Sequence, residues 1–304
     1  MKSKKKLQRI LLPLALTLIL IGIGVAVWLA ASGAGKNRHA EIKDAANTNF
    51  PLRVDFVDVG QGDGILIRCG NETIVIDGGE RDYAGAFVAY LRNEKVSDIS
   101  CYIASHPHND HIGAAPAVFS AFNVHMLMTT AFSELNTPTN VSYEELLTAV
   151  EAERDCEVLF VKAGDTFTFG ELSLQIFAPV SESTNHNDMS IVVKATYGDV
   201  SFLFTGDAEF ESEQAMLDAG FDLRADVLKV GHHGSSSSTT PAFFRAVDPA
   251  AAVISCGKDN VYGHPHREVL QMFENAGISV YRTDRDGTVT ICSDGVDLFV
   301  RRSY

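Results

Sequence analysis

A short apolar run followed by a loop rich in metal-ligand side chains constrains this sequence more than any other feature. Residues 101–104 form the run, and the loop reads Ser-His-Pro-His-Asn-Asp-His from residue 105 to 111. His106, His108, Asp110 and His111 therefore follow an H-x-H-x-D-H spacing, and imidazole with carboxylate suits zinc, manganese or iron. Residues two apart point to the same side of an extended backbone, so the loop can place two ligand pairs side by side. This predicts a site for two neighbouring metal ions, completed by ligands from elsewhere in the fold.

The charge of the 304-residue chain is acidic and unevenly distributed. The formal net charge is −14, and the first ten residues carry five of the cations, so the remainder carries −19. Such a body disfavours broad, non-specific adhesion to nucleic acid, although a local basic groove is compatible with it. Five scattered cysteines without a C-x-x-C pair predict neither a zinc ribbon nor a disulfide framework, and most are expected to be buried. A single bridge stays compatible with a domain outside the cytosol.

An apolar segment without charges spans residues 10–31. Its 22 residues suffice for a transmembrane helix, which needs about 20, and the lysines before it predict a cytoplasmic N-terminus. We therefore expect a basic cytoplasmic tail (1–9), a single-pass membrane anchor (10–31), a linker (32–50) and an extracellular domain (51–304). Small residues at 30–34 also fit a signal-peptide cleavage site, and with cleavage the protein would be secreted.

From residue 52 onward, short β-rich runs alternate with helical patterns. Strands are predicted at 52–57, 64–69, 73–76, 101–104, 125–128, 157–161, 166–169, 172–177, 190–196, 200–205, 227–230, 252–255 and 280–282, with a closing hairpin of 288–292 and 297–301. Helices are predicted at 84–95, 113–122, 143–153 with Ser142 as its cap, 209–219, 241–245 and 267–275. Twice a strand-rich run gives way to helix–strand alternation. This duplication predicts a four-layer αββα sandwich, in which two sheets pack face to face with helices outside.

Four more predicted strand ends carry residues suited to a metal site, as strand ends of α/β proteins often do. Asp77 is followed by two glycines and is expected to orient a ligand histidine, the alternative being a simple turn aspartate. Asp207 follows an apolar strand, and its carboxylate can bridge two metals. His232 and His233 are adjacent, so we expect one of them to face the site, as a ligand or as the acid that protonates a leaving group. His264, before a helix, is a candidate final ligand or a residue without a role.

His186 is an open case. It precedes the strand at 190–196, and it either completes the coordination of the first metal or is an ordinary loop residue.

Residues 52–301 resemble the metallo-β-lactamase-fold hydrolases, and more narrowly the hydrolase domain of ComEC-type DNA-uptake competence proteins. The motifs that carry this resemblance are Asp58-Val59-Gly60-Gln61-Gly62-Asp63, Asp77-Gly78-Gly79, residues 105–111, Asn187-Asp188-Met189-Ser190, Thr205-Gly206-Asp207, residues 226–235 and Gly263-His264-Pro265. It implies one or two divalent ions, Zn or Mn, and no organic cofactor. The implied ligands are His106, His108, Asp110, His111 and Asp207, with His264 and one of His232 or His233 completing or flanking the site and with Asp63 and Asp77 supporting it.

Two departures from the family pattern limit what is carried over. The competence proteins have a large polytopic channel domain, whereas this chain has one hydrophobic segment, so we expect no translocation pore. The superfamily's usual middle histidine has no clear counterpart here, and His186 and the neighbourhood of Asn187 are the candidates.

The resemblance implies metal-assisted hydrolysis. Asp110 or Asp207 would orient the attacking water, and His232 or His233 would protonate the leaving group. Phosphodiester cleavage of nucleic acid outside the cell is the expected reaction. The alternatives are hydrolysis of a small or cell-envelope ester (a phosphodiester or a lactone) and a non-catalytic, metal-binding accessory role in an envelope or DNA-uptake complex.

Overall fold

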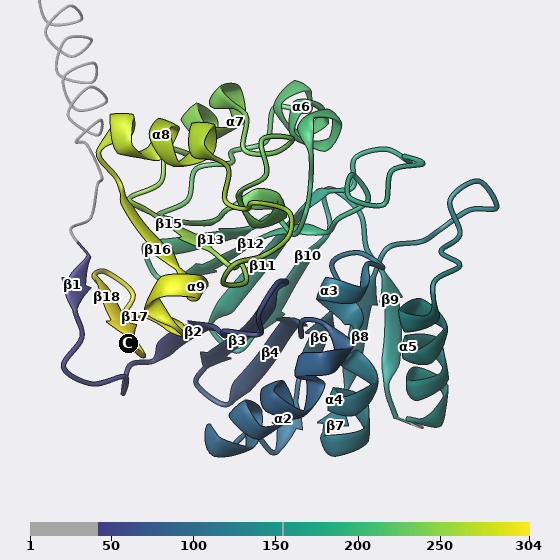
Figure 1. Cartoon of the computed structure of the whole chain (residues 1–304). Coiled ribbons are helices and arrows are strands. Elements are labelled where there is room, and N and C mark those ends of the chain that lie inside the picture. Colours follow the sequence, from purple (N-terminus) through teal and green to yellow (C-terminus); the bar gives the residue numbers. More distant parts are fainter. Residues whose placement is uncertain (1–41, 154) are drawn as a thin grey trace, which may run out of the picture. The chain divides into compact units, whose positions relative to one another are not determined.

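Two β-sheets packed face to face form the centre of the structure, a computed structural model that describes residues 42–153 and 155–304 (Figure 1). One sheet has nine strands in the order β1 (Lys43–Asp44), β18 (Leu298–Arg302), β17 (Val289–Ser293), β2 (Leu52–Phe56), β3 (Gly64–Cys69), β4 (Glu72–Asp77), β6 (Cys101–Ile103), β8 (Met126–Thr129) and β9 (Glu157–Phe160). The other has seven, in the order β10 (Thr166–Phe169), β11 (Leu172–Ala178), β12 (Val192–Tyr197), β13 (Val200–Phe204), β14 (Val227–Lys229), β15 (Ala251–Ile254) and β16 (Ser279–Arg282).

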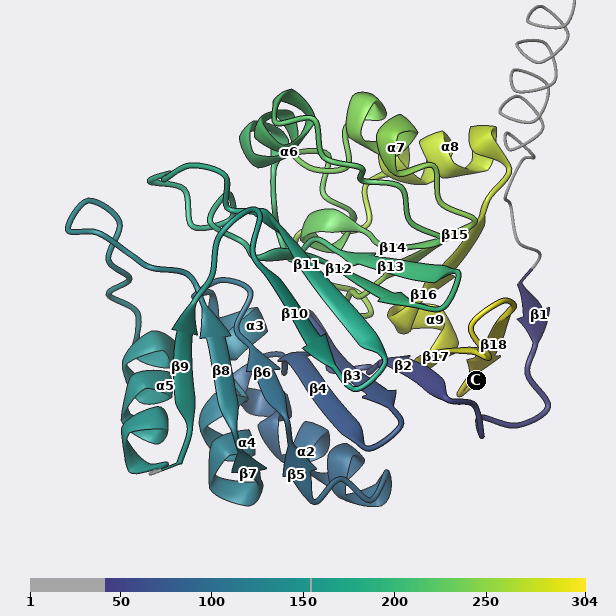
Figure 2. The same cartoon turned by 180° about the vertical axis from the view of Figure 1, so that it is seen from behind.

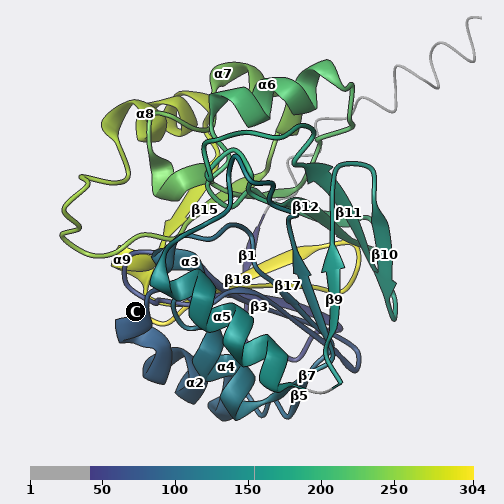
Figure 3. The same ribbon diagram turned by 90° about the vertical axis from the view of Figure 1, so that its right-hand side faces the viewer.

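Helices cover the outer side of each sheet (Figure 3). The nine-stranded sheet is covered by α2 (Ala84–Asn93), α4 (Ala115–Ala121) and α5 (Val141–Ala152), and the seven-stranded sheet by α6 (Phe210–Asp218), α7 (Pro241–Val247) and α8 (Arg267–Ala276). Figure 2 shows the same layers from behind. The shorter elements are α3 (Asn109–Ile112), α9 (Thr283–Asp286), the 3-10 turns η1 (Arg81–Tyr83) and η2 (Gly231–Gly234), and the strand pair β5 (Asp98–Ile99) and β7 (Asn123–Val124). The predicted αββα sandwich is confirmed.

Alternation along the strands divides the apolar residues between the layers. On β3, Ile65 and Ile67 belong to the core between the sheets, whereas Leu66 packs with the cluster under α2 and α4. On β14, Val227 faces the core between the sheets and Leu228 faces the helices. Successive strand residues point to opposite faces, so strands in the middle of four layers must be apolar on both.

The parallel strands carry the loops that position the candidate site. β4, β6, β8 and β9 are parallel neighbours in one sheet, and β13, β14, β15 and β16 are parallel neighbours in the other. The carboxyl ends of parallel strands meet at one edge of a sheet. Loops that follow β4, β6, β13, β14 and β15 therefore converge, although they are widely separated in the sequence.

The prediction that Ser142 caps the helix at 143–153 is wrong. The helix begins at Val141, and Asn140 is its cap, because the Asn140 side chain accepts a hydrogen bond from the Tyr143 N–H (2.9 Å). Ser142 instead donates to Asn109 Oδ1 (2.8 Å), which ties α5 to the histidine loop. Asn140 Nδ2 also donates to the Pro107 carbonyl (2.9 Å), so the capping residue itself helps to fix that loop.

The expected tail (1–9), anchor (10–31) and most of the linker (32–50) lie outside the described residues. Within the described part of the chain, every helix is too short or too polar to cross a bilayer. All five cysteines are free, and all except Cys156 are buried, as the sequence predicted.

Candidate metal centre

A buried carboxylate fixes the histidine loop from behind. Asp77 ends β4 in a left-handed conformation (φ 57°), which aspartate tolerates better than most residues. Its Oδ1 accepts from the Ser105 N–H (2.8 Å), and its Oδ2 accepts from Ser105 Oγ (2.6 Å) and from His111 Nδ1 (2.8 Å). With Nδ1 engaged in this way, His111 directs Nε2 toward the loops of the other sheet. This is the orienting contact that was expected of Asp77.

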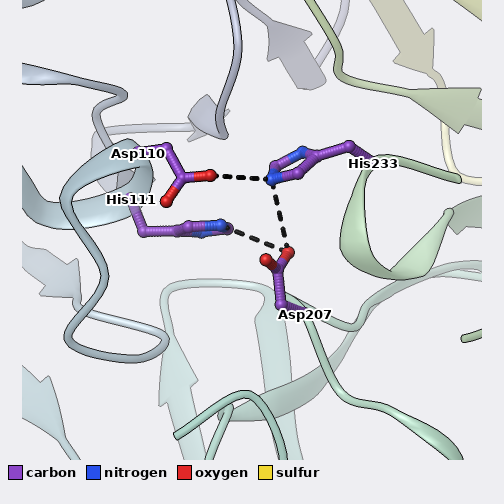
Figure 4. Close-up of side chains that lie close together, drawn as sticks. All are labelled: Asp110, His111, Asp207 and His233. Carbon is purple, nitrogen blue, oxygen red and sulfur yellow. Dashed lines mark ion pairs between the residues drawn. The ribbon is translucent and has the colours of Figure 1, made fainter. Parts of the chain in front are cut away.

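Asp110, His111, Asp207 and His233 bring ligand atoms from both sheets within 4.8 Å of one another (Figure 4). His111 Nε2 lies 3.2 Å from Asp207 Oδ1, while His233 Nε2 lies 3.5 Å from that oxygen and 3.3 Å from Asp110 Oδ2. Bonds of about 2.0–2.2 Å to zinc place neighbouring ligand atoms roughly 3.0–3.6 Å apart. Three of the buried atoms, His111 Nε2, Asp207 Oδ1 and His233 Nε2, have no hydrogen-bond partner. Ligand atoms at this spacing that lack a hydrogen-bond partner fit a site for a divalent cation.

The second oxygen of Asp207 faces another group of ligand-type atoms. Asp207 Oδ2 lies 3.8 Å from His106 Nε2 and 3.7 Å from His232 Nε2. His106 Nε2 lies 3.1 Å from His108 Nδ1. Asp207 thus stands between two groups, as a carboxylate that bridges two ions must.

Both of the adjacent histidines, His232 and His233, line the cavity, whereas the sequence predicted that one of them would face it. His232 (φ 47°, ψ 47°) and His233 (φ 54°, ψ 22°) both have left-handed backbones, which send their side chains apart. His233 is buried and donates from Nδ1 to the Ser255 carbonyl (2.9 Å), which leaves the Nε2 lone pair free for a ligand role. His232 is partly exposed, and its Nδ1 lies 3.0 Å from Glu209 Oε1.

Asp63 supports the cluster through a buried lysine that was not predicted from the sequence. Lys229 Nζ lies 2.5 Å from Asp63 Oδ2 and donates to the Gly206 carbonyl (3.2 Å). The Asp63 N–H donates to the Asp110 carbonyl (3.1 Å), so the Gly-Gln-Gly-Asp segment lies directly against the histidine loop. A Cβ at Gly62 would lie 2.0 Å from that carbonyl oxygen, which explains the glycine. A lysine within the apolar strand β14 is the signal that could have identified it.

Glu209 is a second supporting residue that belongs to none of the motifs described from the sequence. Besides His232, it accepts hydrogen bonds from Ser237 Oγ (2.7 Å), Asn185 Nδ2 (2.7 Å) and Asn187 Nδ2 (3.2 Å). A carboxylate with this many donors is held rigidly, and it fixes the ring of His232. Its position two residues after Asp207, just before α6, was the available signal.

The structure does not bring His186 into the cluster. Its Nε2 lies 2.8 Å from the Asn136 carbonyl oxygen and donates to it, and its ring meets the edge of His108 with centroids 5.9 Å apart. Asp188 fixes the following turn, because its Oδ1 accepts from the N–H groups of Glu209 and Ser212 (3.1 and 3.2 Å). His186 is therefore a neighbour of His108, and the Nε2 atom of His186 is already engaged in a hydrogen bond.

His264 lies beside the cluster. Its ring centroid is 5.4 Å from that of His232 and 6.3 Å from that of His233, and its buried Nδ1 has no hydrogen-bond partner. Burial and the neighbouring histidines lower the pKa of His264 to about 4. It is therefore a neutral imidazole near neutral pH, the form that binds metals.

The electrostatics of the cluster favour a bound cation. Burial opposes ionisation of Asp207, but His111 and His233 hold the pKa of this carboxyl well below its usual range. Burial also opposes protonation of His111, but Asp207 and Asp77 raise its pKa well above the usual value. The pKa of His106 is lowered, first by burial and then by His111. The buried carboxylates of Asp207 and Asp77 thus need compensating positive charge, which either protonated imidazoles or a divalent ion can supply.

A cavity of about 340 Å³ opens over these side chains. It is lined by Gln61, His108, Asn109, Asp110, Asn140, Asn187, Asp207, His232, His233, Tyr262 and His264. Among the described residues that line it, none is a lysine or an arginine. A negatively charged substrate group would therefore depend on the metal site for its charge partner.

Comparison with known proteins places the chain in a family. Residues 57–258 match the family model described as the Metallo-beta-lactamase superfamily. The chain is 31% identical over 255 residues to ComE operon protein 3 of Bacillus subtilis, covering 78% of this chain and 32% of that protein. It is 32% identical over 246 residues to Recombination protein 2 of Haemophilus influenzae, covering 79% of this chain and 28% of that protein. The chain thus spans about a third of the length of these relatives.

Solved structures share the fold at low sequence identity. The CmlA beta-hydroxylase E377D mutant matches with a TM-score of 0.55 and 12% identity over 81% of this chain and 55% of its own. Tm1679, a metal-dependent hydrolase of the beta-lactamase superfamily, matches with a TM-score of 0.51 and 13% identity over 76% of this chain and 95% of its own.

Proposed function

Since the chain belongs to the metallo-beta-lactamase superfamily of metal-dependent hydrolases and is related to competence proteins, we propose that it is a phosphodiesterase that cleaves nucleic acid. One observation carries this proposal. The buried, unpartnered atoms of His111, Asp207 and His233 meet Asp110 below an open cavity that is also lined by His232, whose Nδ1 lies 3.0 Å from Glu209 Oε1.

The ligand roles follow from the surroundings of the two carboxylate oxygens of Asp207. Asp110, His111, His233 and Asp207 Oδ1 would hold one Zn or Mn ion. His106, His108 and Asp207 Oδ2 would hold a second. His264, whose ring lies beside those of His232 and His233, would be a further ligand at the site. Such ions supply positive charge that polarises a phosphoryl oxygen and makes a water molecule easier to deprotonate.

The protein's own groups complete the reaction. The Asp110 side chain is about one quarter exposed and lines the cavity, so it can accept a hydrogen bond from the attacking water and orient it. Glu209 holds His232 through Nδ1, which leaves Nε2 to face the cavity. His232 then donates its Nε2 proton to the leaving oxygen as the new bond from the water oxygen to phosphorus forms and the phosphodiester bond breaks, and the proton lost by the water passes to the solvent of the open cavity.

The cellular setting in this proposal comes from the sequence. The anchor expected at residues 10–31, with cations before it, would hold residues 51–304 outside the cell as an extracellular hydrolase domain. Cleavage of that segment as a signal peptide would release the same domain.

One observation favours a second candidate function. The acidic chain and a cavity without lysine or arginine among its described lining residues suit a small or cell-envelope ester better than a polyanion. The candidate substrates are a phosphodiester in an envelope polymer and a lactone.

A substrate panel separates the two candidates. The full-length chain, loaded with Mn²⁺ or Zn²⁺, is incubated with single-stranded DNA, bis-p-nitrophenyl phosphate and a set of lactones, each with and without EDTA. We expect cleavage of the DNA and of the small diester, and loss of both with EDTA. Cleavage of the small diester or a lactone without DNA would favour the second candidate, and hydrolysis that EDTA does not affect would contradict both.

The role of His232 predicts a substrate-dependent defect. In His232→Gln, cleavage of DNA should fall about 100- to 1,000-fold, because an alkoxide leaves poorly without a proton. Hydrolysis of bis-p-nitrophenyl phosphate should fall far less, since p-nitrophenolate is a stable leaving group. Glu209→Gln should show the same pattern more weakly. Steady-state kinetics on both substrates, with metal content by elemental analysis, makes the comparison.

The metal content decides between the two roles considered for His232. Unchanged metal content with the selective loss supports the proton donor. Metal loss with equal defects on both substrates would instead identify His232 as a ligand.

A further inference from the structure

An exposed aromatic ring lies at the mouth of the cavity. Tyr262 lines the cavity and is 61% exposed, and its ring lies nearly parallel to that of His264, with centroids 5.7 Å apart and an interplanar angle of 23°. One face of the phenol ring therefore rests on a residue of the site, while much of the residue remains open to solvent. The neighbouring Val261 is 93% exposed, and it is not among the residues that line the cavity.

The loop that presents Tyr262 is held on both sides of the ring. Asn260 Nδ2 donates to the carbonyls of Gly257 (2.9 Å) and His264 (2.6 Å), and Asn260 Oδ1 accepts from the His264 N–H (3.0 Å). The Gly257 N–H donates to Gln61 Oε1 (3.0 Å), which joins this loop to another residue that lines the cavity. A side chain in a loop fixed in this way loses little conformational freedom when it binds a flat group.

We propose that Tyr262 is a stacking platform for a nucleobase of single-stranded nucleic acid, next to the phosphodiester that is cleaved. This rests on the proposed nuclease function and names its substrate class. Bases have flat faces that stack on aromatic side chains without regard to sequence. Stacking also needs no cation, so it suits a cavity whose described lining residues include neither lysine nor arginine.

Geometry restricts the platform to unpaired strands. Within a duplex each base is stacked between its neighbours, and its faces are inaccessible to an outside ring. An envelope polymer of sugar or polyol phosphates has no aromatic group to place there. The platform therefore favours single-stranded DNA or RNA over both duplex DNA and the envelope substrates.

Binding and cleavage are measured together on the metal-loaded, full-length chain. The binding probe is a fluorescently labelled ten-nucleotide oligothymidylate with phosphorothioate linkages, read by anisotropy, and the cleavage substrate is the same oligonucleotide with ordinary linkages. An abasic oligonucleotide of equal length and a uridylate oligonucleotide form the other arms. We compare the wild type with Tyr262→Ala, Tyr262→Phe and, as the matched control, Val261→Ala.

Tyr262→Ala should weaken binding of the oligothymidylate and raise its KM about 10-fold, the effect of losing one base stack. Tyr262→Phe and Val261→Ala should stay within about twofold of the wild type, because the first keeps the ring and the second lies outside the cavity. The abasic probe should bind the wild type and Tyr262→Ala equally. Similar results with thymidylate and uridylate would extend the platform to RNA, and a dependence on Tyr262 in thymidylate alone would restrict it to DNA.

The outcomes separate this inference from the nuclease proposal. Cleavage of DNA with a wild-type KM in Tyr262→Ala, or an equal loss on the abasic probe, overturns the platform and leaves the nuclease intact. Binding that depends on Tyr262 without any cleavage supports the platform and overturns the nuclease. Failure of the wild type to bind the oligothymidylate overturns the platform.

Discussion

Asp207→Asn should lower the hydrolysis of bis-p-nitrophenyl phosphate by about 1,000-fold or more, because one carboxylate serves both groups of ligands. Asp207 Oδ1 faces His111 and His233, and Oδ2 faces His106 and His232. The asparagine amide keeps the size of the side chain but removes its charge and replaces one oxygen with a nitrogen that cannot bind a metal. Steady-state kinetics with saturating Mn²⁺ measures the loss.

Asp218→Asn is the matched control, since it makes the same change on the exposed side of α6. It should retain wild-type kcat and KM. Both variants should give far-ultraviolet circular dichroism spectra like that of the wild type. Hydrolysis by Asp207→Asn within about 10-fold of the wild type would contradict a bridging carboxylate.

Asp77→Asn should weaken metal binding about 10- to 100-fold, because Asp77 holds the ring of His111 in place. Asp77 itself is expected to contact no metal. Asp77 accepts hydrogen bonds from the Ser105 N–H, from Ser105 Oγ and from His111 Nδ1. An amide has one acceptor oxygen, so its nitrogen must face either the Ser105 backbone or His111. In the second case His111 must accept at Nδ1 and keep its proton on Nε2, the atom that points into the cluster. Competition with a chromophoric chelator measures the affinity.

The same substitution separates metal binding from folding. Losing one buried hydrogen bond should lower the free energy of unfolding by about 1–3 kcal/mol. Asp77→Ala should cost more, since it removes all three hydrogen bonds and places alanine at a φ of 57°. Denaturant titration in EDTA isolates these effects from metal binding. Wild-type metal affinity in Asp77→Asn would show that His111 is not held through Asp77.

The layered fold was predictable because its strands are short and strongly patterned. In β3, Ile65 and Ile67 face one apolar core and Leu66 faces the other. The three residues therefore form a continuous apolar run after Gly64, which is readily recognised in the sequence. The cap of α5 was mispredicted because Asn140 and Ser142 are both capping residue types. The hydrogen bond from the Tyr143 N–H to Asn140 shows which of them the helix uses, and the contact of Ser142 with Asn109 shows where the other side chain goes.

The candidate site was predictable where ligand-type residues cluster in the sequence, and less so where the fold supplies the partner. The loop from Ser105 to His111 was predictable because side chains of metal-ligand type are so dense in it. The direction of His186, by contrast, depends on the Asn136 carbonyl, which is 50 residues away. Lys229 and Glu209 gain their roles from Asp63 and His232, which no local pattern connects with them.

Metal content tests the central claim most directly, since everything else proposed for the site follows from the cation. The full-length wild type and Asp207→Asn are incubated with excess Mn²⁺ or Zn²⁺, desalted and measured by elemental analysis. The wild type should retain one or two equivalents of metal per chain, and Asp207→Asn should retain less than half of the wild-type amount. Equal retention by both, or a wild type that retains no metal yet still hydrolyses the diester in EDTA, would contradict a metal centre at Asp110, His111, Asp207 and His233.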